Sequence, residues 1–443
     1  MPSSSHPGNA RPGGQRHLAR GALLLATLGV LLVPPAFAAE NEFTLDELLQ
    51  MASEGNREVL AARDQVAAAQ SAIRTAGAFP NPEVEYLSGK SRLRQASGVP
   101  GDLRTVTITQ PLPLPGQLGL RQEAASAYAA AAGAGLASFE ADTAARVKRG
   151  FYDVLRRDAE IRAANEDASL SEQIRSRIEL RVSTGEAPRY ELIKADTELL
   201  TARKTAASAE LRAQQARALL RQSVGDTLPP SFRLRGDVER VLATPLPELD
   251  QLRAEVFARN PEIARARAEV QRAERQLSLE RSLRLPTLAV RASEEQDPEL
   301  RSSRVGVVMS IPLWDQRSGP VGEAAAQLAR ARNQLAAQEF TLAQSVETAY
   351  RQYEIAKAQL GALEAGIIRQ AEAAQRIAEA AYRAGERGIL EYLDAQRVYR
   401  AVRNERIAAR YELAAAVIEI ERLRANRAAV AAPANEQLPE IPR

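Results

Sequence analysis

The sequence predicts a mainly α-helical protein with a small β part, built from duplicated long coiled-coil helical hairpins and four short strands. Ala, Leu, Arg, Glu and Gln dominate its 443 residues and aromatic residues make up only 4%, a composition typical of long helices and coiled coils. About 70 residues separate Pro115 from Pro188 without another proline. The chain from about residue 43 to 224 also recurs from about 247 to 425, at an offset close to 200.

Residues 1–38 have the pattern of a secretory signal peptide. Three arginines precede an apolar run from Gly21 to Val33, and Ala36, Phe37 and Ala38 supply a small-x-small cleavage pattern. Removing this segment takes away three of the 59 basic residues and none of the 56 acidic ones, so the formal net charge falls from +3 to zero. Because nucleic-acid binding requires a basic field, we expect no nucleic-acid partner.

The residue inventory excludes most catalytic chemistry. There is no Cys, and the two histidines, His6 and His17, both lie in the signal segment. The exported chain therefore lacks thiolate nucleophiles, disulfides, the usual zinc, copper or haem ligands, and every triad built on His. It also shows no Gly-rich phosphate loop after a strand and no nucleophile elbow. We expect a protein that is not an enzyme, with no cofactor and no metal site.

Matching positions define two repeats of one architecture. Asn56 corresponds to Asn260, and Glu191 to Glu391. Prolines cluster between the two repeats. The sequence is thus divided into a signal peptide (1–38), a first repeat (39–228), a linker (229–246), a second repeat (247–428) and a disordered tail (429–443).

In the first repeat, proline placement predicts the elements. Pro80 and Pro82 end a helix over 56–78, and strands follow at 83–90 and 105–112, the second with a clear period-2 alternation. The proline-free interval is a helix of roughly 100 Å at 1.5 Å per residue. Gly185 suits the left-handed residue after a helix and Pro188 the first turn of the next one, so an antiparallel helix follows.

The second repeat follows the same scheme. Its predicted strands are 287–294 and 304–313, and its long helix runs from about 321 to 383. Leucines spaced by seven residues in that helix, with Ala between them, predict a coiled-coil seam. Gly385 and Gly388 make the turn, and a last helix extends to about residue 425.

Four strands of about 8 to 10 residues fit a tilted membrane crossing, for which about 9–11 are expected. Four strands cannot close, and an open edge in lipid leaves backbone groups unpaired. If they are membrane strands, several copies must pool them into one barrel. The alternative is a pair of small hairpins packed on a periplasmic helical bundle.

The duplicated order of helix, strand pair, long helix, turn and helix resembles the TolC-type outer-membrane efflux proteins over nearly the whole chain after the signal. Two strand-to-helix junctions, Thr107 to Leu112 and Ser310 to Gly319, resemble the CzcC-like heavy-metal branch of that family. So do Asn56-Arg57-Glu58 and the segment from Phe79 to Pro82.

The resemblance implies a homotrimer with a twelve-stranded β-barrel in the outer membrane of a Gram-negative bacterium, in contact with its lipid, and an α-barrel in the periplasm. It implies passive conduction of substrate, heavy-metal cations among them, from an inner-membrane RND pump. A periplasmic adaptor (membrane fusion) protein would join the pump to the tunnel's inner end.

The resemblance also implies site residues. Glu391 and Asp394 fall on aperture positions, and their spacing of three puts both carboxylates on one helix face. In a trimer they would form acidic rings that favour cations; the alternative is two surface acids near a helix N-terminus. The tip-closure positions are Tyr190, Glu191, Tyr382 and Arg387. The adaptor-docking positions are Val182, Gly185, Glu186, Ala187, Ala384, Gly385, Glu386 and Gly388. Lys194 departs from the family pattern, because it occupies the first-repeat equivalent of Asp394.

Two other functions remain open at the level of sequence. The outer-membrane component of a type I (ABC) secretion system has the same architecture with a different pump. A periplasmic adaptor also carries a coiled-coil hairpin, but adaptors usually have one hairpin flanked by domains rich in short strands, whereas this sequence predicts two hairpins and little other β structure.

Overall fold

A computed structural model describes residues 42–92, 99–243 and 245–425 of the chain. The predicted signal peptide (1–38) and the predicted tail (429–443) lie outside these residues. None of the helices in the described ranges combines the length and apolar content that a membrane-crossing helix needs.

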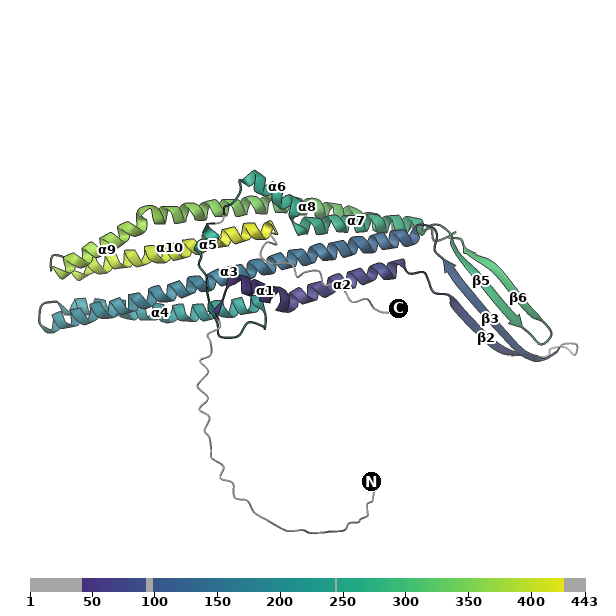
Figure 1. Ribbon diagram of the computed structural model, residues 1–443, viewed down its shortest axis with the longest axis horizontal. Helices are drawn as coiled ribbons and strands as arrows, with labels where there is room; N and C mark the ends of the chain where they lie inside the picture. The colour runs from purple at the N-terminus through teal and green to yellow at the C-terminus, as the bar shows by residue number, and fades with distance from the viewer. Residues whose placement is uncertain (1–41, 93–98, 244, 426–443) are drawn as a thin grey trace, which may run out of the picture. The chain divides into compact units, whose positions relative to one another are not determined.

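Each half of the chain has the same order of elements (Figure 1). The first half contains β1 (Glu42–Phe43), α1 (Leu45–Gly55), α2 (Arg57–Gly77), β2 (Glu83–Ser91), β3 (Gly101–Leu112), α3 (Gln117–Ser183) and α4 (Arg189–Val224). The linker holds β4 (Arg233–Leu234) and α5 (Glu239–Leu242). The second half contains α6 (Leu249–Arg259), α7 (Pro261–Ser282), β5 (Thr287–Gln296), β6 (Arg301–Ser310), α8 (Ser318–Ala362), the π-helical η1 (Leu363–Ile367), α9 (Ile368–Arg383) and α10 (Ile389–Leu423).

The predicted helices and strands are present, but several boundaries differ by a few residues, one helix is interrupted, and some short elements were not predicted. Strand β6 ends at Ser310, before the predicted boundary at 313, because Pro312 has no N–H to donate to a neighbouring strand. The second long helix was expected to be continuous from 321 to 383, but the π-helical turn η1 interrupts it, since an i→i+5 hydrogen bond there inserts an extra residue. The short helices α1 and α6 lie outside the predicted elements.

Asparagine caps explain why α1 and α6 end where the next helix begins. Asn56 accepts hydrogen bonds from the N–H groups of Glu58 and Val59, and its amide donates to the Ser223 carbonyl at 2.9 Å. Its repeat partner Asn260 caps α7 in the same way and donates to the Leu423 carbonyl at 3.1 Å. Each buried amide thus joins a short helix to the end of a long one.

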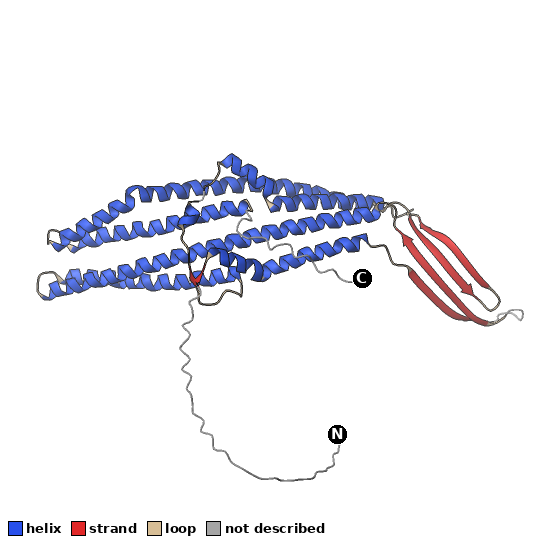
Figure 2. Ribbon diagram, in the orientation of Figure 1, coloured by secondary structure: helices blue, strands red, loops and turns tan. Residues whose placement is uncertain are grey.

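The four longer strands form one antiparallel sheet in the order β2-β3-β5-β6, coloured red in Figure 2. The register aligns Val84 with Ile108, Ile108 with Ala292, and Ala292 with Val305. Paired residues in a sheet point to the same face, so this row is apolar from edge to edge. Its outer members are largely exposed, Val84 at 67% and Val305 at 80%.

The next row lies on the opposite face and is polar. It aligns Glu85 with Thr107, Thr107 with Ser293, and Ser293 with Arg304. The sheet therefore has one apolar face that the described part of the chain leaves exposed and one polar face.

The largest buried cluster lies where the linker meets the long helices. Phe151 of α3, Leu220 of α4, Val241 of α5 and Ile418 of α10 are at most 7% exposed and pack together there. The two-residue strands β1 and β4 pair in parallel at its edge. This core fixes the two hairpins of helices against each other near the linker.

We expect Asn56→Ala and Asn260→Ala each to lower the free energy of unfolding by about 2 kcal/mol, because each removes a helix cap and leaves a carbonyl without its amide donor. Circular dichroism during denaturant unfolding of the purified protein measures this. Asn404→Ala, at an exposed position within α10, is the matched control and should change stability by no more than about 0.5 kcal/mol. Equal losses in all three variants would contradict the role of the caps.

Candidate aperture and docking tips

Both helical hairpins turn with the same backbone geometry. After α3, the N–H of Glu186 donates to the Arg181 carbonyl at 2.8 Å and that of Gly185 to the Val182 carbonyl at 3.2 Å. After α9, Glu386 and Gly385 bond to Ala381 and Tyr382 in the same way, at 3.0 and 3.1 Å. Gly185 and Gly385 have φ of 81° and 74°, the left-handed conformation that this helix-ending motif requires.

The predicted docking positions all lie in or beside these two turns. Gly185, Glu186, Ala384, Gly385, Glu386 and Gly388 are exposed, while Val182 and Ala187 are half-buried. Two like turns at the ends of two hairpins therefore present backbone and small side chains to solvent.

A small core joins the two hairpins just behind the turns. Ile178 of α3, Ala195 of α4, and Ile389 and Tyr392 of α10 are all buried in it. The tips of the hairpins are thus packed against each other within one chain.

Tyr382 covers this core. Its ring stacks on Tyr392 with centroids 5.8 Å apart, and the guanidinium of Arg181 lies 5.5 Å from the Tyr382 centroid. Burial raises the pKa of Tyr392, and the nearby charge of Glu379 adds to that rise. The buried hydroxyl of Tyr382 has no hydrogen-bond partner within the described part of the chain.

The two predicted aperture acids lie on one face of α10 and are both exposed, with side-chain exposures of 55% for Glu391 and 74% for Asp394. Each has a cation beside it: Arg387 Nη1 is 3.2 Å from Glu391, and Arg397 Nη1 is 3.9 Å from Asp394. Arg397 also binds Glu198 of α4 at 2.7 Å, which links the two hairpins.

The first-repeat positions are arranged differently. Lys194 Nζ lies 5.7 Å from the centroid of the Tyr190 ring, and one carboxylate oxygen of Glu191 is buried without a partner. Within the described residues, no hydrogen bond or ion pair joins Tyr190 or Glu191 to Tyr382 or Arg387. Within the described residues, Arg387 pairs instead with the aperture residue Glu391.

Sequence reasoning missed Tyr392, Arg397 and Glu198. Arg397 follows Asp394 by three residues, so an i,i+3 search on α10 would have found that pair. The bond to Glu198 joins residues 199 positions apart, and only the packed hairpins show it.

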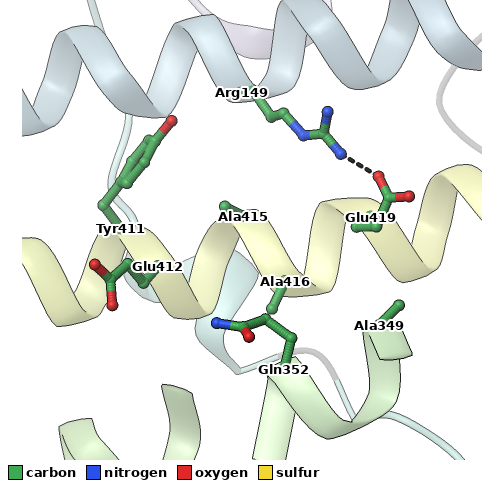
Figure 3. Close-up of a pocket in the computed structure, with 8 residues that line it drawn as sticks. All are labelled: Arg149, Ala349, Gln352, Tyr411, Glu412, Ala415, Ala416 and Glu419. Carbon is green, nitrogen blue, oxygen red and sulfur yellow. Dashed lines mark hydrogen bonds and ion pairs between the residues drawn. The ribbon is translucent and has the colours of Figure 1, made fainter. Parts of the chain in front are cut away.

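A second feature lies midway along the helices, where α3, α8 and α10 enclose a cavity of about 270 Å³ (Figure 3). Arg149 of α3 bridges to Glu419 of α10 across it, and Gln352 of α8 lines it. Burial opposes ionisation of Glu419, but Arg422 and Arg149 outweigh that effect and lower its pKa. The described residues include no group of three or more His, Cys, Asp or Glu that could hold a metal ion.

The sequence matches the family described as outer membrane efflux protein over residues 48–226 and 252–426. It is 27% identical over 380 residues to the cobalt-zinc-cadmium resistance protein CzcC of Cupriavidus metallidurans, which covers 85% of this chain and 88% of that protein.

Solved structures of outer-membrane channels have a similar fold. The outer-membrane channel OprN matches with a TM-score of 0.75 at 18% identity, over 86% of this chain and 89% of that one. CusC matches with a TM-score of 0.70 at 17% identity, over 87% of this chain and 92% of that one.

We expect Gly185→Ala and Gly385→Ala to destabilise the turns by about 1–2 kcal/mol, because a Cβ disfavours positive φ and no neighbouring atom within 4 Å adds a packing effect. Hydrogen–deuterium exchange of the peptides that contain Glu186 and Glu386 should be faster by about tenfold. Gly133→Ala, in the interior of α3 and equally free of neighbours, is the control. Unchanged exchange at the turns in both tip variants would show that the left-handed glycine is dispensable.

Proposed function

Because this chain belongs to the outer membrane efflux protein family, we propose that three copies of it form an outer-membrane channel that passively conducts substrate out of the cell. The observation that carries this proposal is the sheet: it has one exposed apolar face, one polar face and two outer strands, β2 and β6, that each have a single partner among the described strands.

Lipid makes closure necessary. Each backbone N–H or C=O left unpaired in a bilayer costs several kcal/mol. Pairing β6 of one copy with β2 of the next satisfies both edges, and three copies give a twelve-stranded β-barrel. The row that contains Val84 and Val305 then faces lipid, and the row that contains Glu85 and Arg304 faces water in the lumen.

The helices supply the tunnel. Helix α3 has 67 residues and spans about 100 Å at 1.5 Å per residue. It leads from the sheet to the first tip, as α8, η1 and α9 lead to the second. In a trimer these hairpins form an α-barrel that reaches through the periplasm.

We assign the two turns to docking of a periplasmic adaptor, which joins the channel to an inner-membrane RND-type pump. The exposed turn residues from Gly185 to Ala187 and from Ala384 to Gly388 form that surface. Repeated backbone geometry at both tips supports one kind of docking contact used twice per chain.

Divalent metal cations are the cargo that we favour, because the relative CzcC is a cobalt-zinc-cadmium resistance protein. Glu391 and Asp394 repeat around the threefold axis as two rings of three carboxylates at the inner aperture. Such rings attract cations and repel anions.

Closure of the tip involves Tyr190, Glu191, Tyr382 and Arg387 in contacts between neighbouring hairpins. From the turn before α10, Arg387 already binds Glu391, and Tyr382 has a buried hydroxyl without a partner in the described part of the chain. Movement of the second hairpin away from the first breaks the Arg397–Glu198 bond, which is the hydrogen-bonded ion pair between the hairpins at this level.

Substitution on the apolar face tests the trimeric barrel. Val307→Arg should prevent outer-membrane assembly, because Arg on a lipid-facing strand position costs about 2–4 kcal/mol per copy near the midplane. Val308→Arg, on the polar face of the same strand, is the control and should assemble. Fractionation followed by light scattering of the detergent-solubilised protein measures the outcome. A wild-type protein that is monomeric, or two variants that assemble equally well, would contradict the proposal.

Charge removal tests the aperture. Glu391→Gln with Asp394→Asn should lower the cation-over-anion permeability ratio by about fivefold, the effect of about 1 kcal/mol for one charge at 4 Å in water. Reversal potentials across a salt gradient in planar bilayers report it. The control variant, Glu54→Gln with Glu262→Gln, removes the same number of negative charges from α1 and α7. It should leave the cation-over-anion permeability ratio unchanged. Equal ratios in wild type and aperture variant would show that both acids only decorate an outward helix face.

A further inference from the structure

A second cavity, of about 370 Å³, lies between α3 and α10 and is bounded by residues 236–238 of the linker. Its volume is in the range of small-molecule sites. Helices α3 and α10 contact each other, whereas α4 packs on α3 and α9 on α10. The cavity therefore lies between the two central helices of the layer in Figure 1.

Arginine dominates the lining. Five guanidinium groups surround the cavity, against two carboxylates, those of Glu166 and Asp237. The arginines are Arg156 and Arg162 of α3 and Arg403, Arg406 and Arg410 of α10.

Three of these arginines are held by acids of the protein. Arg156 binds Glu160 at 2.8 Å, Arg403 binds Asp167 at 2.7 Å, and Arg410 binds Glu239 of α5 at 2.9 Å. The first pair lies within α3, and the other two fix the walls, since they join α10 to α3 and to the linker.

The other two, Arg162 and Arg406, form no ion pair with any residue in the described part of the chain. In the described part of the chain the two lining acids make other contacts: Glu166 lies 3.4 Å from Arg403, and Asp237 accepts a hydrogen bond from the Glu239 N–H at 3.2 Å. Two cations on facing helices are thus left without counter-charges at one cavity.

The linker wall is rigid. A Cβ on Gly236 would stand 2.6 Å from Cζ of the buried Phe151 ring, so the linker backbone lies directly against the core of the protein. The guanidinium of Arg156 on α3 lies 5.1 Å from the centroid of the Tyr411 ring on α10, and this tyrosine gives the cavity an aromatic wall. A ligand therefore meets a cavity whose walls are held by ion pairs and core packing, with the guanidinium groups of Arg162 and Arg406 available to it.

We propose that this cavity binds a small oxyanion with at least two charged oxygens, from a phosphate or a carboxylate compound, and that Arg162 and Arg406 bind it. Guanidinium groups match the geometry of both oxyanions, often with two parallel hydrogen bonds. The bound anion would bridge α3 and α10 beside the linker. This inference does not rest on the proposed transport function.

Isothermal titration calorimetry of the full-length protein in detergent tests the proposal. Sodium citrate and sodium pyrophosphate are the two probes, with sodium chloride at matched ionic strength as the blank. We expect saturable binding of at least one probe, and binding of only citrate or only pyrophosphate identifies the carboxylate or phosphate class. Arg162→Gln with Arg406→Gln should weaken the affinity at least about tenfold, because each lost charge-assisted hydrogen bond has about that effect.

Matched variants separate the site from general charge. Arg259→Gln with Arg284→Gln removes two exposed arginines outside the cavity and should bind like wild type. Each single variant, Arg162→Gln and Arg406→Gln, should show part of the loss. Absence of saturable binding with both probes overturns the proposal. So does equal affinity in wild type and in the Arg162/Arg406 double variant, or an equal loss in both double variants.

Discussion

Backbone hydrogen bonding at the outer strands of the sheet is the constraint on which the rest of the structure depends. Strands β2 and β6 each pair on one side only within the described chain, and the row through Val84, Ile108 and Val305 makes one sheet face apolar. In water, that apolar face would stay exposed to solvent. In lipid, the backbone N–H and C=O groups on the free edges of β2 and β6 would lack hydrogen-bond partners. Closure with further copies satisfies both requirements. In the proposed trimer, the long helices attached to the closed sheet surround the same axis.

Ion pairs between the central helices constrain the helical layer. Lys148 of α3 binds Glu421 of α10 at 2.6 Å, and Arg403 binds Asp167 further along, both pairs being at most 21% exposed in their side chains. Burial raises the pKa of Asp167, although Arg400 and Arg403 oppose the rise. Removal of one partner from such a pair leaves a buried charge and costs about 3–5 kcal/mol, more than the pair itself contributes. These pairs fix which helix faces meet, while small residues such as Ala145 and Ala414 allow close approach.

The sequence predicted those features that local chemistry determines. Prolines and glycines located both turns, and the repeat identified Asn56 and Asn260 as equivalent, although their capping role became visible only in the structure. The π-helical turn at Leu363–Ile367 has no distinctive local pattern, so it was not predicted. The pair Arg397–Glu198 and the cavity near Arg406 join segments far apart in the chain, and spacing along one helix carries no information about them. At the tip, the sequence could predict which positions are involved but not which side chains touch, because in the proposed trimer those contacts form between copies of the chain.

The strength of the contacts at the tip decides how the channel can open. Arg387–Glu391 joins the turn before α10 to the first turn of that helix, so it can persist when the hairpin moves as a body, and the same holds for the stacked rings of Tyr382 and Tyr392. Arg397–Glu198 crosses from α10 to α4. Such a partly exposed pair contributes about 0–1 kcal/mol, or no more than about 3 kcal/mol over three copies. A docking partner that binds the open tips more tightly than the closed ones by about that amount offsets the cost of breaking these ion pairs. The small apolar core around Ile178 and Ile389 joins the two hairpins, so it must open as well, and it accounts for the larger part of the cost of opening.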